Sequence, residues 1–230
     1  MNTIAANIDI ICQEINDLSI KYTKPAAKLV AVSKTYPSEI IKIAYEHGQR
    51  YFGENYALEL AQKSTELKQF KDIEWHFIGT IQSNKSKIIA ETASWVHTLT
   101  KLSHASRLNQ QRPKHLSPLQ VLIEVNISNE PSKQGLINYE EIFNLATQLK
   151  DFNNLKLRGL MGMATTDANN SMIHEEFTQL NHYLQKLNCQ GFNLDQLSMG
   201  MSRDYPIALE CGSTLIRVGS KIFGKRNYVK

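Results

Sequence analysis

A lysine follows a short apolar stretch near the start of the chain, in the sequence LVAVSKT at residues 29–35. Small and β-branched residues alternate there as in a buried parallel strand, so Lys34 is expected at the C-terminal end of that strand. Burial and nearby cations disfavour the ammonium form of a lysine, and a neutral amine can form a Schiff base with a carbonyl compound. The alternative is a structural ion pair with an inward-facing acid such as Glu54 or Glu124.

Two glycine- and serine-containing segments near the other end of the chain suggest what that carbonyl compound is. SMGMSRD contains Ser198, and VGSKIFG places Gly219 and Ser220 directly after an apolar run. Such segments bind phosphate in many barrel enzymes, because their backbone N–H groups face the anion. Glycines needed merely for tight turns explain either segment alone equally well. A Schiff-base lysine combined with a phosphate site nevertheless points to a phosphorylated aldehyde, of which pyridoxal 5′-phosphate (PLP) is the obvious candidate.

Three further polar residues are candidate ligands of the same cofactor. Arg217 precedes Gly219 by two residues, so it shares a strand face with the glycine and could reach the ring nitrogen of PLP. A guanidinium keeps its proton and would leave that nitrogen unprotonated, which favours holding the cofactor over carbanion chemistry. A salt bridge to a buried glutamate is the structural alternative for Arg217. Asn55 could hydrogen-bond the cofactor and His76 could pack on its ring, although His76 also suits a core position.

These residues need a scaffold that brings strand ends together. Eight strand-like runs, mostly separated by helical segments, occur along the chain. They lie at residues 29–35, 51–55, 75–79, 95–99, 120–126, 157–163, 197–202 and 214–220. Alternating strands and helices predict parallel pairing, and eight units in 230 residues favour a single closed (β/α)₈ barrel over an open doubly wound sheet. Isoleucines at helical spacing predict an additional N-terminal helix within residues 1–22, packed on a barrel domain of residues 1–230.

Composition narrows the class of protein. The chain is 42% hydrophobic, and its formal net charge of +4 is spread out rather than clustered, which is weak evidence for a nucleic-acid partner. Three distant cysteines suggest neither disulfides nor a zinc site and favour a reducing cytoplasm. Acidic residues interrupt the N-terminal apolar pattern, so neither a signal peptide nor a membrane-spanning helix is expected. A monomer is expected, because no exposed apolar stripe stands out beyond the first helix.

The chain resembles the pyridoxal phosphate homeostasis protein family nearly end to end. The strings that carry the resemblance are AVSKT, FGENY, EWHFIGTIQSNK, NISNEPSKQG, LRGLMGMA, LSMGMSRD and GSTLIRVGSKIFGKRNY. The resemblance implies a barrel like the N-terminal domain of alanine racemase, with PLP on Lys34. It also implies the phosphate near Ser198, Gly219 and Ser220, and Arg217 near the ring nitrogen. TTDANNSMIHEE is generic, so nothing is carried over to it. Lys133, in NEPSKQG, could contact a ligand, although a solvated surface lysine is the default interpretation.

Family membership implies a function and leaves two alternatives open. The implied function is to hold PLP and supply it to apo-enzymes, so that the free aldehyde stays scarce, without a firm catalytic activity. A racemase-like PLP enzyme is the first alternative, but such enzymes use a second domain to bring a tyrosine base to the substrate, and no residues remain after Lys230 to build one. A Schiff-base aldolase acting on a sugar phosphate is the second, and it would carry no bound chromophore.

Overall fold

The computed structural model describes residues 3–224, so the ends of the predicted domain, residues 1–2 and 225–230, lie outside the described part. Eight parallel strands close into a barrel in chain order, with β8 pairing back onto β1, as the sequence predicts. The strands are β1 (Lys28–Val32), β2 (Tyr51–Glu54), β3 (Glu74–Phe77), β4 (Trp95–Leu99), β5 (Leu119–Val125), β6 (Leu155–Gly162), β7 (Gln196–Ser198) and β8 (Leu215–Val218).

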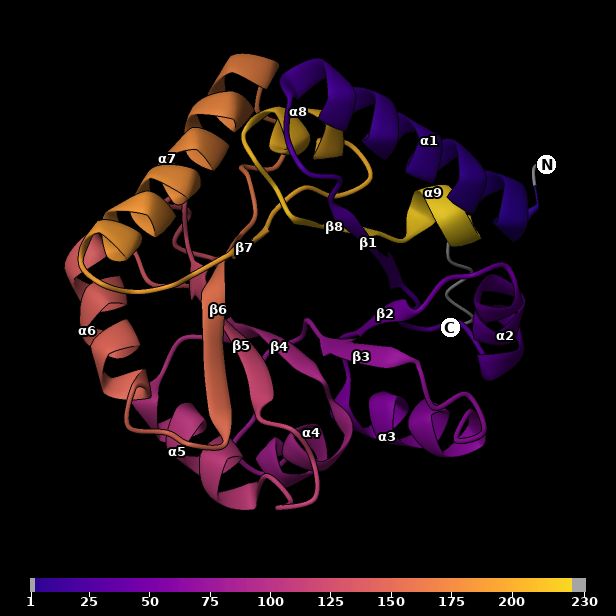
Figure 1. Cartoon of the computed structure of the whole chain (residues 1–230), viewed down its shortest axis with the longest axis horizontal. Helices are drawn as coiled ribbons and strands as arrows, with labels where there is room; N and C mark the ends of the chain where they lie inside the picture. Colours follow the sequence, from indigo (N-terminus) through magenta and orange to yellow (C-terminus); the bar gives the residue numbers. More distant parts are fainter. Residues whose placement is uncertain (1–2, 225–230) are drawn as a thin grey trace.

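Helices surround this barrel on its outer side (Figure 1). They are α1 (Ile4–Tyr22), α2 (Ser38–Glu46), α3 (Ala57–Glu66), α4 (Ser86–Thr92), α5 (Leu102–Gln111), α6 (Tyr139–Leu149), α7 (Asn170–Cys189), α8 (Tyr205–Glu210) and α9 (Ser220–Phe223). Their buried faces and the outer faces of the strands form the main hydrophobic core. No helix among the described residues is long and apolar enough to cross a membrane.

The predicted N-terminal helix is α1. Thr3 caps it by accepting a hydrogen bond from the Ala6 amide at 3.2 Å, and the buried residues Ile8, Ile11 and Ile15 form one face. That face packs against α2, α8 and α9, so α1 covers the seam at which β8 meets β1 (Figure 1). The first helix of the chain is therefore held mainly by elements from its last part.

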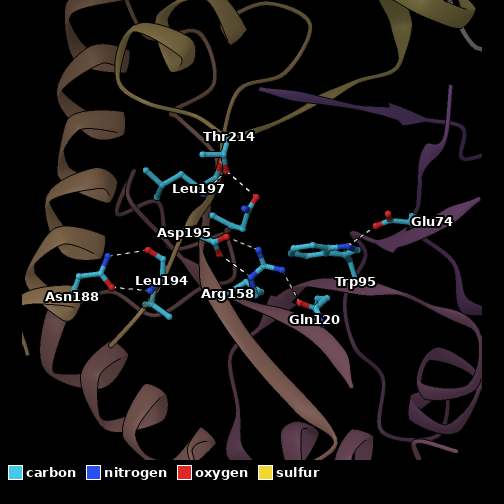
Figure 2. A network of polar contacts seen from close by, with 10 residues as sticks. Glu74, Trp95, Gln120, Arg158, Asn188, Leu194, Asp195, Leu197 and Thr214 are labelled. Atoms are coloured by element: carbon cyan, nitrogen blue, oxygen red, sulfur yellow. Dashed lines mark hydrogen bonds and ion pairs between the residues drawn. The ribbon is translucent and has the colours of Figure 1, made fainter. Parts of the chain in front are cut away.

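A network of polar contacts lies near the N-terminal ends of several strands (Figure 2). Arg158 donates to both carboxylate oxygens of Asp195, at 2.8 and 2.5 Å, and to Gln120 at 2.8 Å. Its guanidinium lies 5.2 Å from the centre of the Trp95 ring, whose Nε1 donates to Glu74 at 3.0 Å. Contacts at this end of a barrel serve stability, since chemistry is found at the opposite end.

Inside the barrel, a small apolar cluster adjoins this network and shares Trp95 with it. It consists of Val30, Trp95, Leu122, Met161 and Leu215, with Tyr51 and Met163 packed against it. Toward the C-terminal ends of the strands the interior becomes polar although it remains buried. Buried polar groups must be paired or face a ligand, so this end is the place to look for a site.

Candidate functional site

A cavity of about 1010 Å³ opens at the C-terminal ends of the strands and is lined from all eight of them or from the loops that follow. Five of the seven predicted cofactor-binding residues line it, namely Lys34, Asn55, Arg217, Gly219 and Ser220. The other two, His76 and Ser198, are buried in the barrel and do not line the cavity. Within residues 3–224, no group of three or more His, Cys, Asp or Glu side chains is placed to hold a metal ion.

Lys34 lies in a turn rather than on a strand. β1 ends at Val32, and Lys34 follows two residues later as a half-buried side chain that lines the cavity. The turn is closed by a hydrogen bond from the Tyr36 amide to the Ser33 carbonyl at 3.1 Å, and Thr35 adopts a left-handed conformation with φ of 70°. Lys34, expected at the C-terminal end of the strand, therefore lies just beyond it, because the chain turns earlier.

Glu54, at the end of β2, is paired with a lysine that the sequence reading overlooked. Lys63 of α3 lies 2.8 Å from Glu54, and both side chains are buried. Burial raises the pKa of the Glu54 carboxyl to about 7, while Lys63 acts in the opposite direction. The sequence suggests Glu54 as a structural partner for Lys34 or Arg217, whereas in the structure Glu54 forms its ion pair with Lys63.

Arg217 is the first member of a buried chain of hydrogen bonds that crosses the barrel. Its Nη1 donates to Ser198 Oγ at 2.6 Å, and its Nη2 donates to the Gly162 carbonyl at 3.1 Å. Ser198 Oγ lies 2.8 Å from His97 Nδ1, and His97 Nε2 lies 2.8 Å from His76 Nδ1. Ser198 and His76 thus lie beneath the cavity, connected to it through Arg217.

The donors in this chain indicate its direction. A guanidinium only donates, so Ser198 accepts from Arg217. The Ser198 hydroxyl has no other acceptor among the described residues, so we assign its proton to His97 Nδ1, and the next hydrogen bond then runs from His97 Nε2 to His76. Burial lowers the pKa of His76 to about 3 and that of His97 well below 6.5, so both rings are neutral. Burial also lowers the pKa of Arg217 to about 10, opposed by Asp204 and Glu124, so Arg217 stays charged at neutral pH.

His97 is a residue that the sequence reading missed. It follows Trp95 by two positions on β4, and that spacing put it on the same inward face. Its partner Ser198 is 101 residues away in the chain, which the local pattern could not show. His76 stacks on Trp95, with ring centroids 5.5 Å apart and planes 4° from parallel, which is the core position weighed for it.

Glu124 presents an unused oxygen at the cavity. Its side chain is 4% exposed and lines the cavity, and its Oε2 has no hydrogen-bond partner among the described residues. Burial raises the pKa of this carboxyl to about 7, with the Arg217 charge opposing the shift. A buried polar atom without a partner is costly, so Glu124 is ready to contact a bound polar group.

The loops around the mouth supply further polar contacts. Ser220 donates to Ser202 at 3.1 Å beside Gly219. Lys133 lines the cavity rather than lying in solvent, which leaves the ligand-contacting alternative open to it, and it joins Glu130 at 2.7 Å to the Ala164 carbonyl at 2.8 Å. This contact links the loop after β5 to the loop after β6.

The segment just after β3 packs closely against Asn55. A Cβ built on Gly79 would lie 1.9 Å from the Asn55 carbonyl oxygen, so only glycine allows this approach. The backbone of Asn55 is thereby held beside the cavity that its side chain lines.

Comparisons with known proteins agree with this architecture. The family model of the alanine racemase N-terminal domain matches residues 5–227. A pyridoxal phosphate homeostasis protein of Vibrio alginolyticus is 46% identical over 234 residues, covering 99% of this chain and all of the relative.

Among solved structures, PipY of Synechococcus elongatus is 31% identical and covers 96% of this chain. It superposes with a TM-score of 0.87 in its form without PLP and 0.84 with PLP bound. Alanine racemase of Clostridium difficile superposes with a TM-score of 0.74 at 13% identity, a likeness of fold alone. The chain therefore belongs to the pyridoxal phosphate homeostasis protein family, whose barrel is that of the alanine racemase N-terminal domain.

Proposed function

We propose that this protein binds PLP in the cavity as a Schiff base on Lys34 and supplies it to apo-enzymes, as a factor in intracellular vitamin B6 homeostasis. The observation that carries the proposal is the convergence of Lys34, Arg217 and the Gly219–Ser220 segment on one cavity. A phosphorylated pyridine aldehyde needs an amine, a partner for the ring nitrogen and donors for the phosphate, and these groups supply all three. The names of the relatives and the PLP-bound form of PipY support the same ligand.

Each residue has a separate part in this proposal. The Lys34 amine condenses with the cofactor aldehyde and one water leaves, and addition of water reverses the bond and frees the aldehyde for transfer. Arg217, fixed by Ser198 and Gly162, donates to the ring nitrogen and cannot give up its proton. Glu124 Oε2 is available to the cofactor from the β5 side. Asn55 and Ser220 offer further hydrogen bonds at the rim, Ser220 to the phosphate.

A carrier fits the site better than an enzyme. Holding the ring nitrogen unprotonated weakens the cofactor as an electron sink, so carbanion chemistry gains little from Arg217. The second candidate, a weak racemase-like PLP enzyme, is favoured by the fold and by Glu124, a carboxyl in the cavity whose pKa is near 7. Incubation with D- and L-amino acids separates the two, since turnover that depends on Lys34 would favour the enzyme.

The visible spectrum of the purified protein tests PLP binding. Addition of PLP should give a yellow protein, and borohydride should abolish the band and attach the reduced cofactor to the peptide that contains Lys34. Lys34→Ala should show no such band, whereas Lys133→Ala, which removes another lysine of the cavity, should retain it. Attachment to a different residue, or a colourless protein after PLP is added, would refute the Schiff base on Lys34.

The delivery step needs its own experiment. Protein loaded with PLP is mixed with an apo-enzyme whose activity reports the cofactor, in the presence of a scavenger for free PLP. Activation that exceeds the activation by free PLP under the same scavenger supports supply to apo-enzymes, and equal activation refutes it. We further propose that the protein is a cytoplasmic monomer. Light scattering of the loaded protein tests its oligomeric state.

A further inference from the structure

A buried cluster of charges lies directly behind the Lys34 turn and lines no part of the cavity. Lys63 is 5% exposed and contacts Glu54, which is fully buried, at 2.8 Å and Glu59, 22% exposed, at 2.6 Å. We call these three residues the Lys63 cluster. None of the three lines the cavity, so the cluster has no direct contact with a ligand held there.

The contacts of the Lys63 cluster reach both neighbours of Lys34. Lys63 donates to the Ser33 carbonyl at 2.8 Å, and the Ser33 hydroxyl donates to Glu54 at 2.6 Å. On the other side, the Thr35 amide donates to Glu59 Oε1 at 2.6 Å, the oxygen that also accepts from Lys63. The residue before and the residue after Lys34 are thus joined to one buried cation.

The free-energy cost of burying these charges indicates that the Lys63 cluster does more than stabilise the fold. Removing three charged groups from water is costly, and well-packed apolar side chains of similar volume are often as stable or more so. The turn also holds Thr35 at φ of 70°, a conformation that a threonine adopts only when its surroundings impose it. The residue next to Lys34 is held in this turn by the hydrogen bond from its amide to Glu59 and by the hydrogen bond from the Tyr36 amide to the Ser33 carbonyl.

We propose that Lys63, Glu54 and Glu59 are positioning residues, which hold the backbone on both sides of Lys34 so that its amine is aimed into the cavity. The chemical consequence rests on the proposed function, since it concerns the rate at which Lys34 captures and releases an aldehyde. A misplacement of about 1 Å in a reacting group can cost about a hundredfold in rate, so loss of the cluster should slow capture strongly.

Matched variants separate positioning from stability. Glu59→Gln keeps an acceptor for the Thr35 amide, whereas Glu59→Leu removes it. Lys63→Met removes the cation, and the double variant Lys63→Met with Glu54→Gln does so without leaving a buried carboxylate alone. Lys42→Met removes an exposed lysine from an ion pair on α2 and serves as the control.

Two readouts that need no cofactor follow the turn itself. Hydrogen exchange of the amides of residues 33–36 is measured for every protein. Acetylation of Lys34 by acetic anhydride is also measured for every protein, relative to that of Lys42 in the same chain. In the Lys42→Met control, Lys87 is the reference lysine instead. We expect faster exchange and changed Lys34 acetylation in Glu59→Leu and in the double variant. We expect near-normal values of both in Glu59→Gln and Lys42→Met. Unchanged exchange and acetylation in both disrupting variants, with folding intact by circular dichroism, overturn the proposal.

The rate of borohydride-trapped PLP capture gives the chemical readout. It should fall roughly tenfold or more in Glu59→Leu and the double variant, and much less in Glu59→Gln. Normal capture rates in both disrupting variants refute the positioning role while the proposed function stands. If the wild-type protein captures no PLP, the proposed function fails, and the exchange and acetylation results alone decide whether the cluster positions Lys34.

Discussion

The hydroxyl of Ser198 lies between the Arg217 guanidinium, at 2.6 Å, and His97 Nδ1, at 2.8 Å, in the buried interior of the barrel. Arg217 lines the cavity and His97 does not, so this serine connects the candidate site to the barrel core. The position of the guanidinium therefore depends on side chains that a ligand does not touch.

Ser198→Ala should destabilise the protein and weaken its hold on PLP. The change leaves Arg217 Nη1 without its acceptor and His97 Nδ1 without its donor, and a buried unsatisfied group costs about 1–3 kcal/mol. Urea unfolding and the PLP dissociation rate measure the two effects. Ser171→Ala, at an exposed position of α7, should stay within about 0.5 kcal/mol of the wild type. Equal behaviour of the two variants would contradict a role for the buried hydroxyl.

His97 should be a neutral ring protonated on Nε2. The Ser198 hydroxyl accepts from Arg217 and has no acceptor other than His97 Nδ1 among the described residues, and its donation there places the ring proton of His97 on Nε2. Nitrogen chemical shifts of the two imidazole atoms report the tautomer, and neither His97 nor His76 should titrate between pH 5 and 8. Observation of the Nδ1–H tautomer would reverse the direction assigned to the hydrogen-bond chain.

The pH dependence of stability should differ between the wild type and Glu124→Gln. Burial raises the pKa of Glu124 from 4.5 to about 7 in the folded protein. Between these values the unfolded chain loses this proton first, so the free energy of unfolding of the wild type falls as pH rises, relative to that of the variant. The difference should level off above about pH 7. Urea unfolding from pH 4 to 8 measures it, and a constant difference would show that Glu124 titrates normally.

Arg158→Ala should lower stability without changing the site. The substitution removes the contacts of Arg158 to Asp195, Gln120 and the Trp95 ring, and partly exposed networks of this kind contribute about 1 kcal/mol. Thermal unfolding should register the loss, whereas the PLP spectrum and dissociation rate should match those of the wild type. A changed spectrum would mean that the two ends of the barrel are coupled.

The barrel was predictable because its signal is repeated eight times along the chain. Each apolar run in the sequence corresponds to a strand, and the errors lie at the ends of the runs. The first run extends to Thr35, but the strand ends at Val32, because Ser33 bonds to Glu54 and the Thr35 amide bonds to Glu59. Those partners lie on later elements, so nothing local marks where the strand stops.

The site was predictable in part for a similar reason. Parallel strands end at the same rim, so Lys34, Asn55 and Arg217 meet at the cavity whatever the details of packing. Whether a polar residue reaches the cavity or lies beneath it depends on the layer of the barrel that it occupies. His76 and Lys63 show the difficulty, since one lies deeper than its strand position suggested and the other acts from a helix.

The position of α1 has a consequence for how the chain reaches this structure during synthesis. Its buried isoleucines pack on elements that include α8 and α9. Those two helices begin about 180 residues after α1 ends, so they leave the ribosome later during synthesis. The earliest helix can meet α2 soon after it is made, but it must remain without α8 and α9 until those two helices have been synthesised. Completion of the barrel is expected to be a late, concerted event rather than a stepwise addition of units from the N-terminus.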